Sequence, residues 1–100
     1  MIKIKIETSY VPLTQIIKQD VPSGVSVNIP PFKEQRGMDA ETTIMIILTV
    51  TNMAIPFIVE WLRFKKITER ATKITIDEKE VELEYGDIKR IIDRKITTEQ

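Results

Sequence analysis

Alternation of apolar and polar residues predicts two strands in the first third of the chain. Residues 2–7 alternate isoleucine with lysine or glutamate, and residues 25–29 alternate valine or isoleucine with serine and asparagine. A period of two is typical of strands with one buried face. Between these runs, Pro12 can open a short helix, in which apolar residues follow at helical spacing until Pro22 and Gly24 end it. The segment therefore predicts strand, short helix, strand.

A β-hairpin is predicted over residues 73–85. Two alternating runs of apolar and polar residues enclose the polar segment Asp77-Glu78-Lys79-Glu80, which is the pattern of two strands joined by a turn. Gly86 and Asp87 then start a C-terminal helix, because isoleucines recur on one stripe after them.

The middle of the chain divides into a loop and an apolar segment. Residues 30–38 hold two prolines and a glycine, so we predict an internal loop that presents Phe32 as an exposed anchor. From 40 to 70, Pro56 is the main helix breaker, and we predict one long helix that is kinked near Pro56. The alternative interpretation is a buried strand followed by a helix that begins at Pro56.

Together these elements predict a single α+β domain over residues 1–100. The expected order is β-α-β-α-β-β-α, and half-buried strands need an apolar cover on one face. We therefore expect a two-layer sandwich, with a small sheet covered by the long apolar helix and the C-terminal helix.

The run of residues 44–59 contains no charged side chain. A helix so broadly apolar must be buried nearly all round, and the sheet of so small a domain covers only one side of it. We expect the rest to be buried in a homo-oligomer or by another protein, with Phe32, Ile47, Thr51, Ile55 and Trp61 as candidate partner-binding residues. The alternative is a membrane helix, although the run is shorter than the roughly 20 residues of a typical span.

Composition argues against most catalytic chemistry. The chain has no cysteine and no histidine, so it lacks thiolate ligands and the commonest general base. Its three glycines are scattered and form no phosphate-binding loop. Alternating glutamates at 78, 80, 82 and 84 can bind a divalent cation only if they share one strand face, and the simpler interpretation is a solvated face. We expect no enzymatic activity, no cofactor and no metal.

The net charge and the N-terminal residues limit the expected partners and the expected cellular location. Fifteen basic and fifteen acidic residues give a formal net charge of +0, which does not favour nucleic acid as a partner. The first residues, Met-Ile-Lys-Ile-Lys-Ile-Glu, lack the apolar core of a signal peptide. We therefore expect a cytoplasmic protein, or one at the inner membrane if the apolar run is a membrane helix.

From residue 30 onward the chain resembles a known family. Gly37-Met38 follows a proline-bearing loop and precedes the apolar segment, which ends in Trp61-Leu62-Arg63. Lys-Ile-Thr-Ile at 73–76 and Val-Glu-Leu-Glu at 81–84 precede the final helix. These motifs and the element order resemble the effector-associated constant component family, which comprises small bacterial proteins encoded in conflict and anti-phage operons.

The resemblance implies a function without assigning residues to it. The family is regarded as non-enzymatic and occurs beside effectors such as proteases and beside regulatory NTPases. It therefore implies an adaptor that couples a sensor or regulator to an effector in a bacterial defence system. The alternative function is that of a small membrane-anchored or membrane-perturbing protein.

Overall fold

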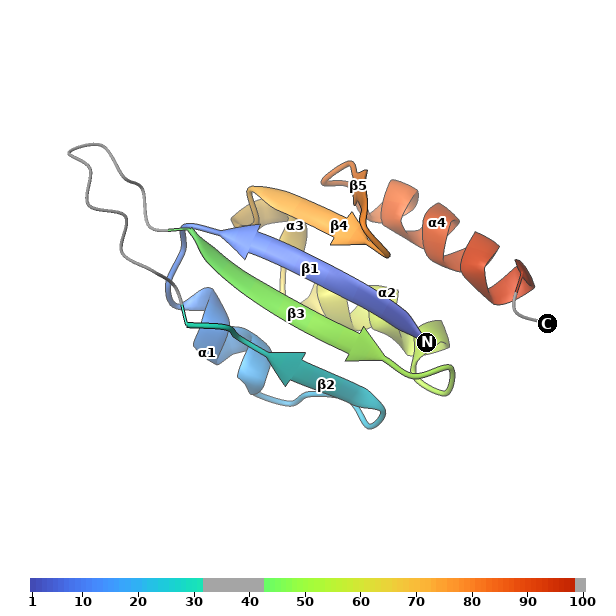
Figure 1. Cartoon of the computed structure of the whole chain (residues 1–100), viewed down its shortest axis with the longest axis horizontal. Coiled ribbons are helices and arrows are strands. Elements are labelled where there is room, and N and C mark those ends of the chain that lie inside the picture. The colour runs from blue at the N-terminus through green and yellow to red at the C-terminus, as the bar shows by residue number, and fades with distance from the viewer. Residues whose placement is uncertain (32–42, 99–100) are drawn as a thin grey trace.

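The structure, a computed structural model, describes residues 1–31 and 43–98. These residues form a five-stranded antiparallel sheet and four helices (Figure 1). In chain order the elements are β1 (Ile2–Thr8), α1 (Leu13–Lys18), β2 (Val25–Asn28), β3 (Ile44–Val50), α2 (Ile55–Phe64), α3 (Ile67–Arg70), β4 (Lys73–Ile76), β5 (Lys79–Val81) and α4 (Tyr85–Thr98).

The sheet contains two interleaved crossover units. Its strand order is β2-β3-β1-β4-β5, and every neighbouring pair is antiparallel. Consequently β1 and β2 run parallel on either side of β3, and β3 and β4 run parallel on either side of β1. Each parallel pair is joined through helices, which is the split β-α-β connectivity of ferredoxin-like domains. The hairpin strand β5 and helix α4 extend this arrangement at one edge.

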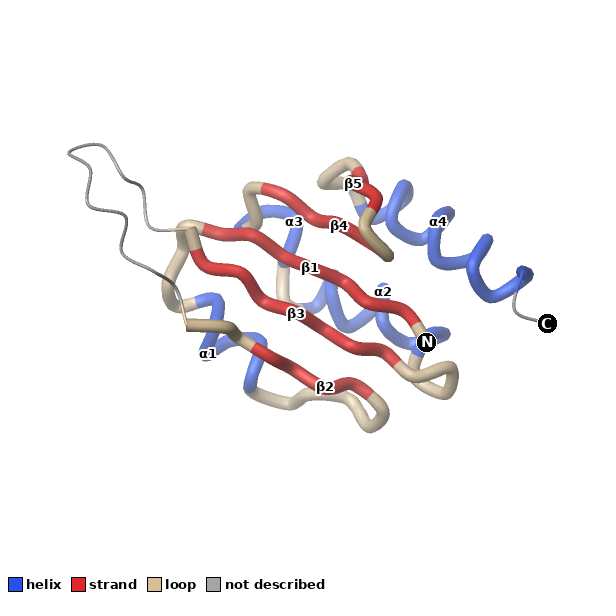
Figure 2. The backbone as a smooth tube through the Cα atoms, viewed as in Figure 1, coloured by secondary structure: helices blue, strands red, loops and turns tan. Residues whose placement is uncertain are grey.

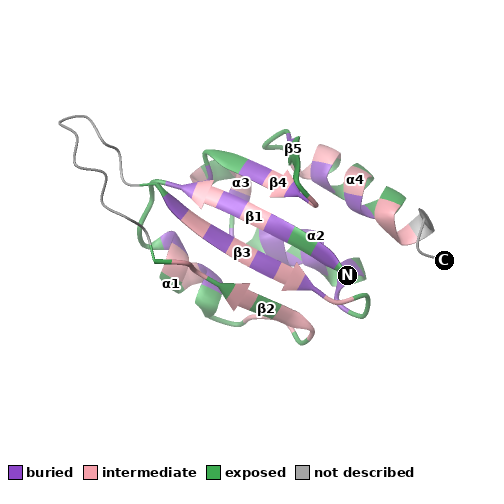
Figure 3. Ribbon diagram, in the orientation of Figure 1, coloured by how far each residue is buried: buried purple, intermediate pink, exposed green. Residues whose placement is uncertain are grey.

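The core lies between one sheet face and the helices. Along β1 and β3 every second residue is buried, so both strands place their side chains alternately toward the helices and toward the opposite face (Figure 3). Helices α2 and α3 lie behind the sheet in the view of Figure 2. Helix α4 adds Ile88 and Ile92 to the same apolar cluster. The α+β class and the two-layer sandwich are thus confirmed, with an element order roughly as expected.

The prediction of one long helix over residues 40–70 is wrong. Residues 44–50 form β3, and only after a turn does the chain enter α2, followed by the short α3. The alternative interpretation is confirmed for this part, since Pro56 lies in the first turn of α2, where its missing N–H costs nothing. Residues 44–50 are rich in β-branched side chains, which favour the extended backbone.

The 73–85 hairpin forms, but it is shorter than predicted. Strand β5 ends at Val81, and Tyr85 already belongs to α4. The turn consists of Asp77 and Glu78, both with positive φ, at 47° and 72°. Two consecutive residues in the left-handed region are the signature of a type I′ turn, whose twist matches that of the flanking strands. The predicted loop over 30–38 lies largely outside the described residues.

Candidate interaction surfaces

Helix α2 exposes large apolar side chains on the face that points away from the sheet. Phe57 is 66% exposed and Phe64 is 74% exposed, while Met53, in the turn before the helix, is 69% exposed. The two phenylalanines are seven positions apart, so both lie on one side of the helix about 10 Å apart along its axis. We refer to Phe57 and Phe64 as the aromatic stripe.

The opposite face of α2 explains why the stripe points outward. Ile58 and Leu62 are fully buried against the core, and Ile55 is 2% exposed. This buried face fixes the rotation of the helix, because turning it would expose these aliphatic residues. The phenylalanines are therefore held in solvent by the packing of their neighbours.

Cations border the aromatic stripe. Residues 60–70 carry four basic and two acidic side chains. The Lys65 ammonium lies 5.5 Å from the ring centre of Phe64, and the Arg63 guanidinium lies 5.4 Å from that of Tyr85. Such cation–π contacts are weak at exposed sites. The contact with Lys65 nevertheless places positive charge beside the exposed ring of Phe64.

The second surface is the sheet face opposite the helices. Its central strands contribute Met45, Ile47 and Thr49 from β3 and Lys3, Lys5 and Glu7 from β1. The flanking strands add Ser26, Asn28, Lys73, Thr75 and Glu80. In the view of Figure 1 no described helix lies in front of the sheet. We call this set the open face.

The residues proposed from sequence as partner-binding do not form one surface. Ile55 and Trp61 are buried in the core of the chain, at 2% and 9% exposure, so little of either side chain remains accessible to a partner. The indole N–H of Trp61 donates to the Asp20 carbonyl oxygen, 3.1 Å away. Ile47 lies on the open face and is partly exposed. Phe32 lies outside the described residues.

Thr51 has a structural position beside Gly24. Its backbone N–H donates to the Gly24 carbonyl oxygen at 2.9 Å. Its hydroxyl is buried and has no hydrogen-bond partner within the described part of the chain. Thr51 is therefore part of a tight junction between the residue before β2 and the turn that leads into α2, and its hydroxyl does not point outward to a partner.

Sequence reasoning missed Phe57 and Phe64. In a single broadly apolar helix over residues 40–70, these two residues do not stand out from their neighbours. The pattern could have been found by starting the helix at Pro56, because Ile58 and Leu62 then form the inward face and Phe57, Glu60 and Phe64 the outward face.

The glutamates at 78, 80, 82 and 84 do not share a strand face. Glu78 belongs to the turn, Glu80 lies in β5, and the other two follow the end of that strand. Within residues 1–31 and 43–98 no group of three or more acidic side chains is arranged to hold a metal ion. The cation-binding alternative therefore has no geometric support from these glutamates.

Asp77 connects the hairpin turn to two other elements. It accepts a hydrogen bond from the Lys3 backbone N–H at 2.9 Å, and it forms an ion pair with Lys95 of α4 at 2.9 Å. Partial burial by itself raises the pKa of the Asp77 carboxyl. The hydrogen bond from Lys3 and the nearby Lys95 ammonium outweigh this effect and hold the pKa below its ordinary value. The charged form is therefore favoured by folding.

Replacing Asp77 by asparagine is expected to lower the free energy of unfolding at pH 7 by about 1 kcal/mol. Asparagine tolerates positive φ, so the turn should remain and the loss should come from the charge. A carboxyl with a lowered folded pKa contributes stability above its unfolded pKa of about 3.9 and loses it as pH falls through the folded value. Urea unfolding should show the difference at pH 7 and little difference near pH 2.

The control for this change is Glu80→Gln. Glu80 pairs with Lys73 at 3.6 Å, but both side chains are about half or more exposed, so the pair should contribute little. Equal losses for the two variants, or a loss for Asp77→Asn that persists at pH 2, would contradict the role assigned to the Asp77 charge.

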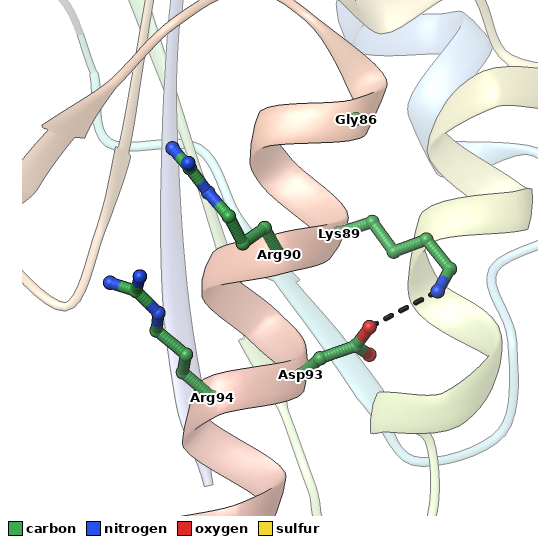
Figure 4. A pocket seen from close by; sticks show the side chains of 5 residues that line it. All are labelled: Gly86, Lys89, Arg90, Asp93 and Arg94. Atoms are coloured by element: carbon green, nitrogen blue, oxygen red, sulfur yellow. Dashed lines mark hydrogen bonds and ion pairs between the residues drawn. The ribbon is translucent and has the colours of Figure 1, made fainter.

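A hollow of about 460 Å³ lies on α4, lined by Gly86, Lys89, Arg90, Asp93 and Arg94 (Figure 4). Lys89 pairs with Asp93 at 3.1 Å, and Arg90 pairs with Asp87. The hollow is wide open and its charges are largely compensated by neighbours on the same helix. It has neither the depth nor the convergent polar groups of a catalytic pocket.

None of the helices in the described residues has the length and apolar character needed to cross a bilayer. Comparison of the chain with protein-family models, curated proteins and solved structures gives no match.

Proposed function

We propose that this protein is a non-enzymatic interaction module that binds a partner protein through the aromatic stripe of α2. The observation that carries the proposal is the pair Phe57 and Phe64, held in solvent by a helix whose other face is packed in the core. Aromatic side chains on a rigid element make effective anchors, because they bury a large area with little loss of conformational entropy.

The energetics favour a protein partner of defined chemistry. Burying one phenylalanine contributes about 1.5–3 kcal/mol, so two adjacent anchors can supply a large part of a micromolar affinity, about −8 kcal/mol. The excess of basic residues over 60–70 favours a partner groove that is apolar at its centre and acidic at its rim. It disfavours a second copy of the same stripe, since Arg63 and Lys66 would then face like charges.

The family resemblance suggests which partners the protein binds and in which biological system it acts. An effector-associated constant component would couple a regulatory NTPase or sensor to an effector such as a protease in the cytoplasm of a bacterium with a conflict system. A small domain with an exposed anchor suits such an adaptor. The proteins encoded beside its gene are therefore the first partners to test.

A membrane surface is the second candidate for the same stripe. Phenylalanines flanked by lysine and arginine also occur on helices that lie in the bilayer interface. The acidic Glu60, which lies between Phe57 and Phe64 and pairs with Arg63 at 3.5 Å, opposes attraction to anionic lipid. We therefore favour the protein partner.

Changing both phenylalanines to serine is expected to weaken partner binding at least about thirtyfold, since a loss of about 1 kcal/mol per anchor totals about 2 kcal/mol. Stability should change little, because both side chains are exposed. Titration calorimetry with the neighbouring gene products measures the affinity, and thermal unfolding measures the stability. Leu83→Ser, which removes another exposed apolar residue outside the stripe, is the matched control.

Binding to vesicles of phosphatidylethanolamine and phosphatidylglycerol separates the two candidates. The protein-partner proposal is contradicted if the Phe57→Ser/Phe64→Ser variant keeps wild-type affinity for the partner. It is also contradicted if the wild type binds vesicles tightly, the variant does not, and no neighbouring gene product binds at all.

A further inference from the structure

The open face carries apolar and charged side chains at regular positions set by the strand register. The register places Lys5 opposite Ile47 of β3 and Thr75 of β4, and it places Glu7 opposite Met45 and Lys73. Met45 and Ile47 are thus two apolar side chains on β3 that are bordered by the charged side chains of β1. Both are partly exposed in the isolated chain, so further burial of this face would be favourable.

The charges on β1 change sign along the strand. Lys5 and Glu7 lie two positions apart and therefore point to the same side of the sheet. Neither forms an ion pair with another residue in the part of the chain that the structure describes. A positive group followed by a negative group on the central strand makes this face complementary to itself when one copy is turned around.

We propose that the open face binds a second copy of this chain, sheet against sheet, with the two β1 strands antiparallel across a two-fold axis near Ile6 and Ile46. Turning one copy about this axis places Lys5 opposite the partner's Glu7 and Ile47 opposite the partner's Met45. Each dimer then contains two ion pairs and two apolar contacts, as an isologous interface requires. Sheets packed in this way lie about 10 Å apart, which a lysine and a glutamate together can span.

The area of the open face sets the expected affinity of the dimer. Strands about 4.8 Å apart with a rise of about 3.3 Å per residue give the sheet a projected area on the order of 400 Å². A standard stable interface buries about 800 Å² per partner. The dimer should therefore be reversible, with a dissociation constant in the micromolar range, and raised salt should weaken it.

The chemistry of the face favours a second copy over nucleic acid. Sheets that read single-stranded RNA stack bases on aromatic side chains of their central strands, and the open side of β1 and β3 carries none. The proposal goes beyond partner binding by α2, because it assigns a different surface, on the opposite layer of the domain, and a different occupant. The two surfaces together would make the adaptor bivalent.

A charge-swap experiment tests the proposal. By sedimentation equilibrium at 10–500 µM (a range of about two decades around the expected constant), the wild type should be in monomer–dimer equilibrium. Lys5→Glu alone and Glu7→Lys alone should each weaken dimerisation at least tenfold, because like charges then face each other. The double variant Lys5→Glu/Glu7→Lys should recover the wild-type constant, and an equimolar mixture of the two single variants should form mixed dimers.

Two further variants complete the design. Ile47→Asp should yield a folded monomer, and Lys18→Glu, an exposed change of the same charge on α1, should leave the dimer unchanged. A wild type that stays monomeric throughout the concentration range overturns the proposal, and so do single variants that dimerise as well as the wild type. Neither result affects partner binding by α2, because Phe57→Ser/Phe64→Ser tests that surface separately and should leave this dimer intact.

Discussion

Replacing Trp61 by alanine is expected to destabilise the domain by about 3–5 kcal/mol. The side chain is only 9% exposed, and its indole N–H donates to the Asp20 carbonyl oxygen, so the change leaves a cavity and removes this hydrogen bond. For a domain of this size 1 kcal/mol corresponds to about 4–8 °C in the melting temperature. A loss of at least about 12 °C should follow. Far-UV circular dichroism suits the measurement, because Trp61 is the only tryptophan and its fluorescence is lost.

The control for Trp61→Ala is Phe57→Ala. Both changes remove an aromatic ring from α2, but Phe57 is 66% exposed, so its removal should change stability by less than about 0.5 kcal/mol. The two variants therefore distinguish a core aromatic from a surface one on the same helix. A Trp61→Ala protein as stable as Phe57→Ala would place Trp61 on the surface and contradict the packing described here.

The change Gly24→Ala is expected to cost about 3 kcal/mol. Gly24 has φ of 88°, a conformation that strains any residue with a Cβ by about 1–2 kcal/mol. An added Cβ would also lie 2.5 Å from the Thr51 hydroxyl oxygen and 3.2 Å from the Ala54 Cβ. The junction between β2 and the start of α2 would have to open. Urea unfolding followed by tryptophan fluorescence measures the loss.

Gly86→Ala is the matched control, because Gly86 lies in the first turn of α4 with 3.4 Å to the nearest atom, a flexible glutamate oxygen. That change should be neutral or stabilise by up to about 1 kcal/mol. Adding Thr51→Ala to Gly24→Ala should recover part of the loss by removing the clash, while the backbone strain remains. Equal effects of alanine at positions 24 and 86 would be inconsistent with this junction.

Strands with one solvent-exposed face could be predicted from the sequence, because apolar and polar residues alternate along them with a period of two. Ile2, Ile4 and Ile6 alternate with charged residues, and the structure buries these three isoleucines in β1. Val25 and Val27 form β2 for the same reason, and the isoleucine stripe after Gly86 forms α4. Local alternation was enough wherever solvent covers the other side of the element.

Strand β3 could not be distinguished from a helix by the same reasoning. Met45 and Ile47 are apolar although they face the open side of the sheet, so the run 44–50 has no period of two. An uninterrupted apolar run is compatible with a buried strand and with a buried helix. The error then extended through Pro56 and produced the 40–70 helix.

Because the long helix is wrong, the candidate partner-binding residues chosen from it are also not the exposed ones. Without the correct start of α2, Trp61 and Ile55 could not be separated as inward residues from Phe57 and Phe64 as outward ones. The sequence predicts only that Ile47 is an apolar residue that a partner covers. The structure places it on the open face, and the covering partner stays a prediction. Whether an apolar residue faces the core or the open side depends on which distant strands pair. This pairing cannot be read from a single sequence.

The central claim, that the aromatic stripe binds a partner protein, is tested most directly by amide chemical-shift mapping on the ¹⁵N-labelled chain. The measurement adds each neighbouring gene product, unlabelled, in turn. We expect the partner to perturb amides of α2 around Phe57, Arg63 and Phe64 and to leave those around Ile47 unchanged. Perturbations centred on the open face or on the α4 hollow, with the α2 amides unmoved, would contradict it.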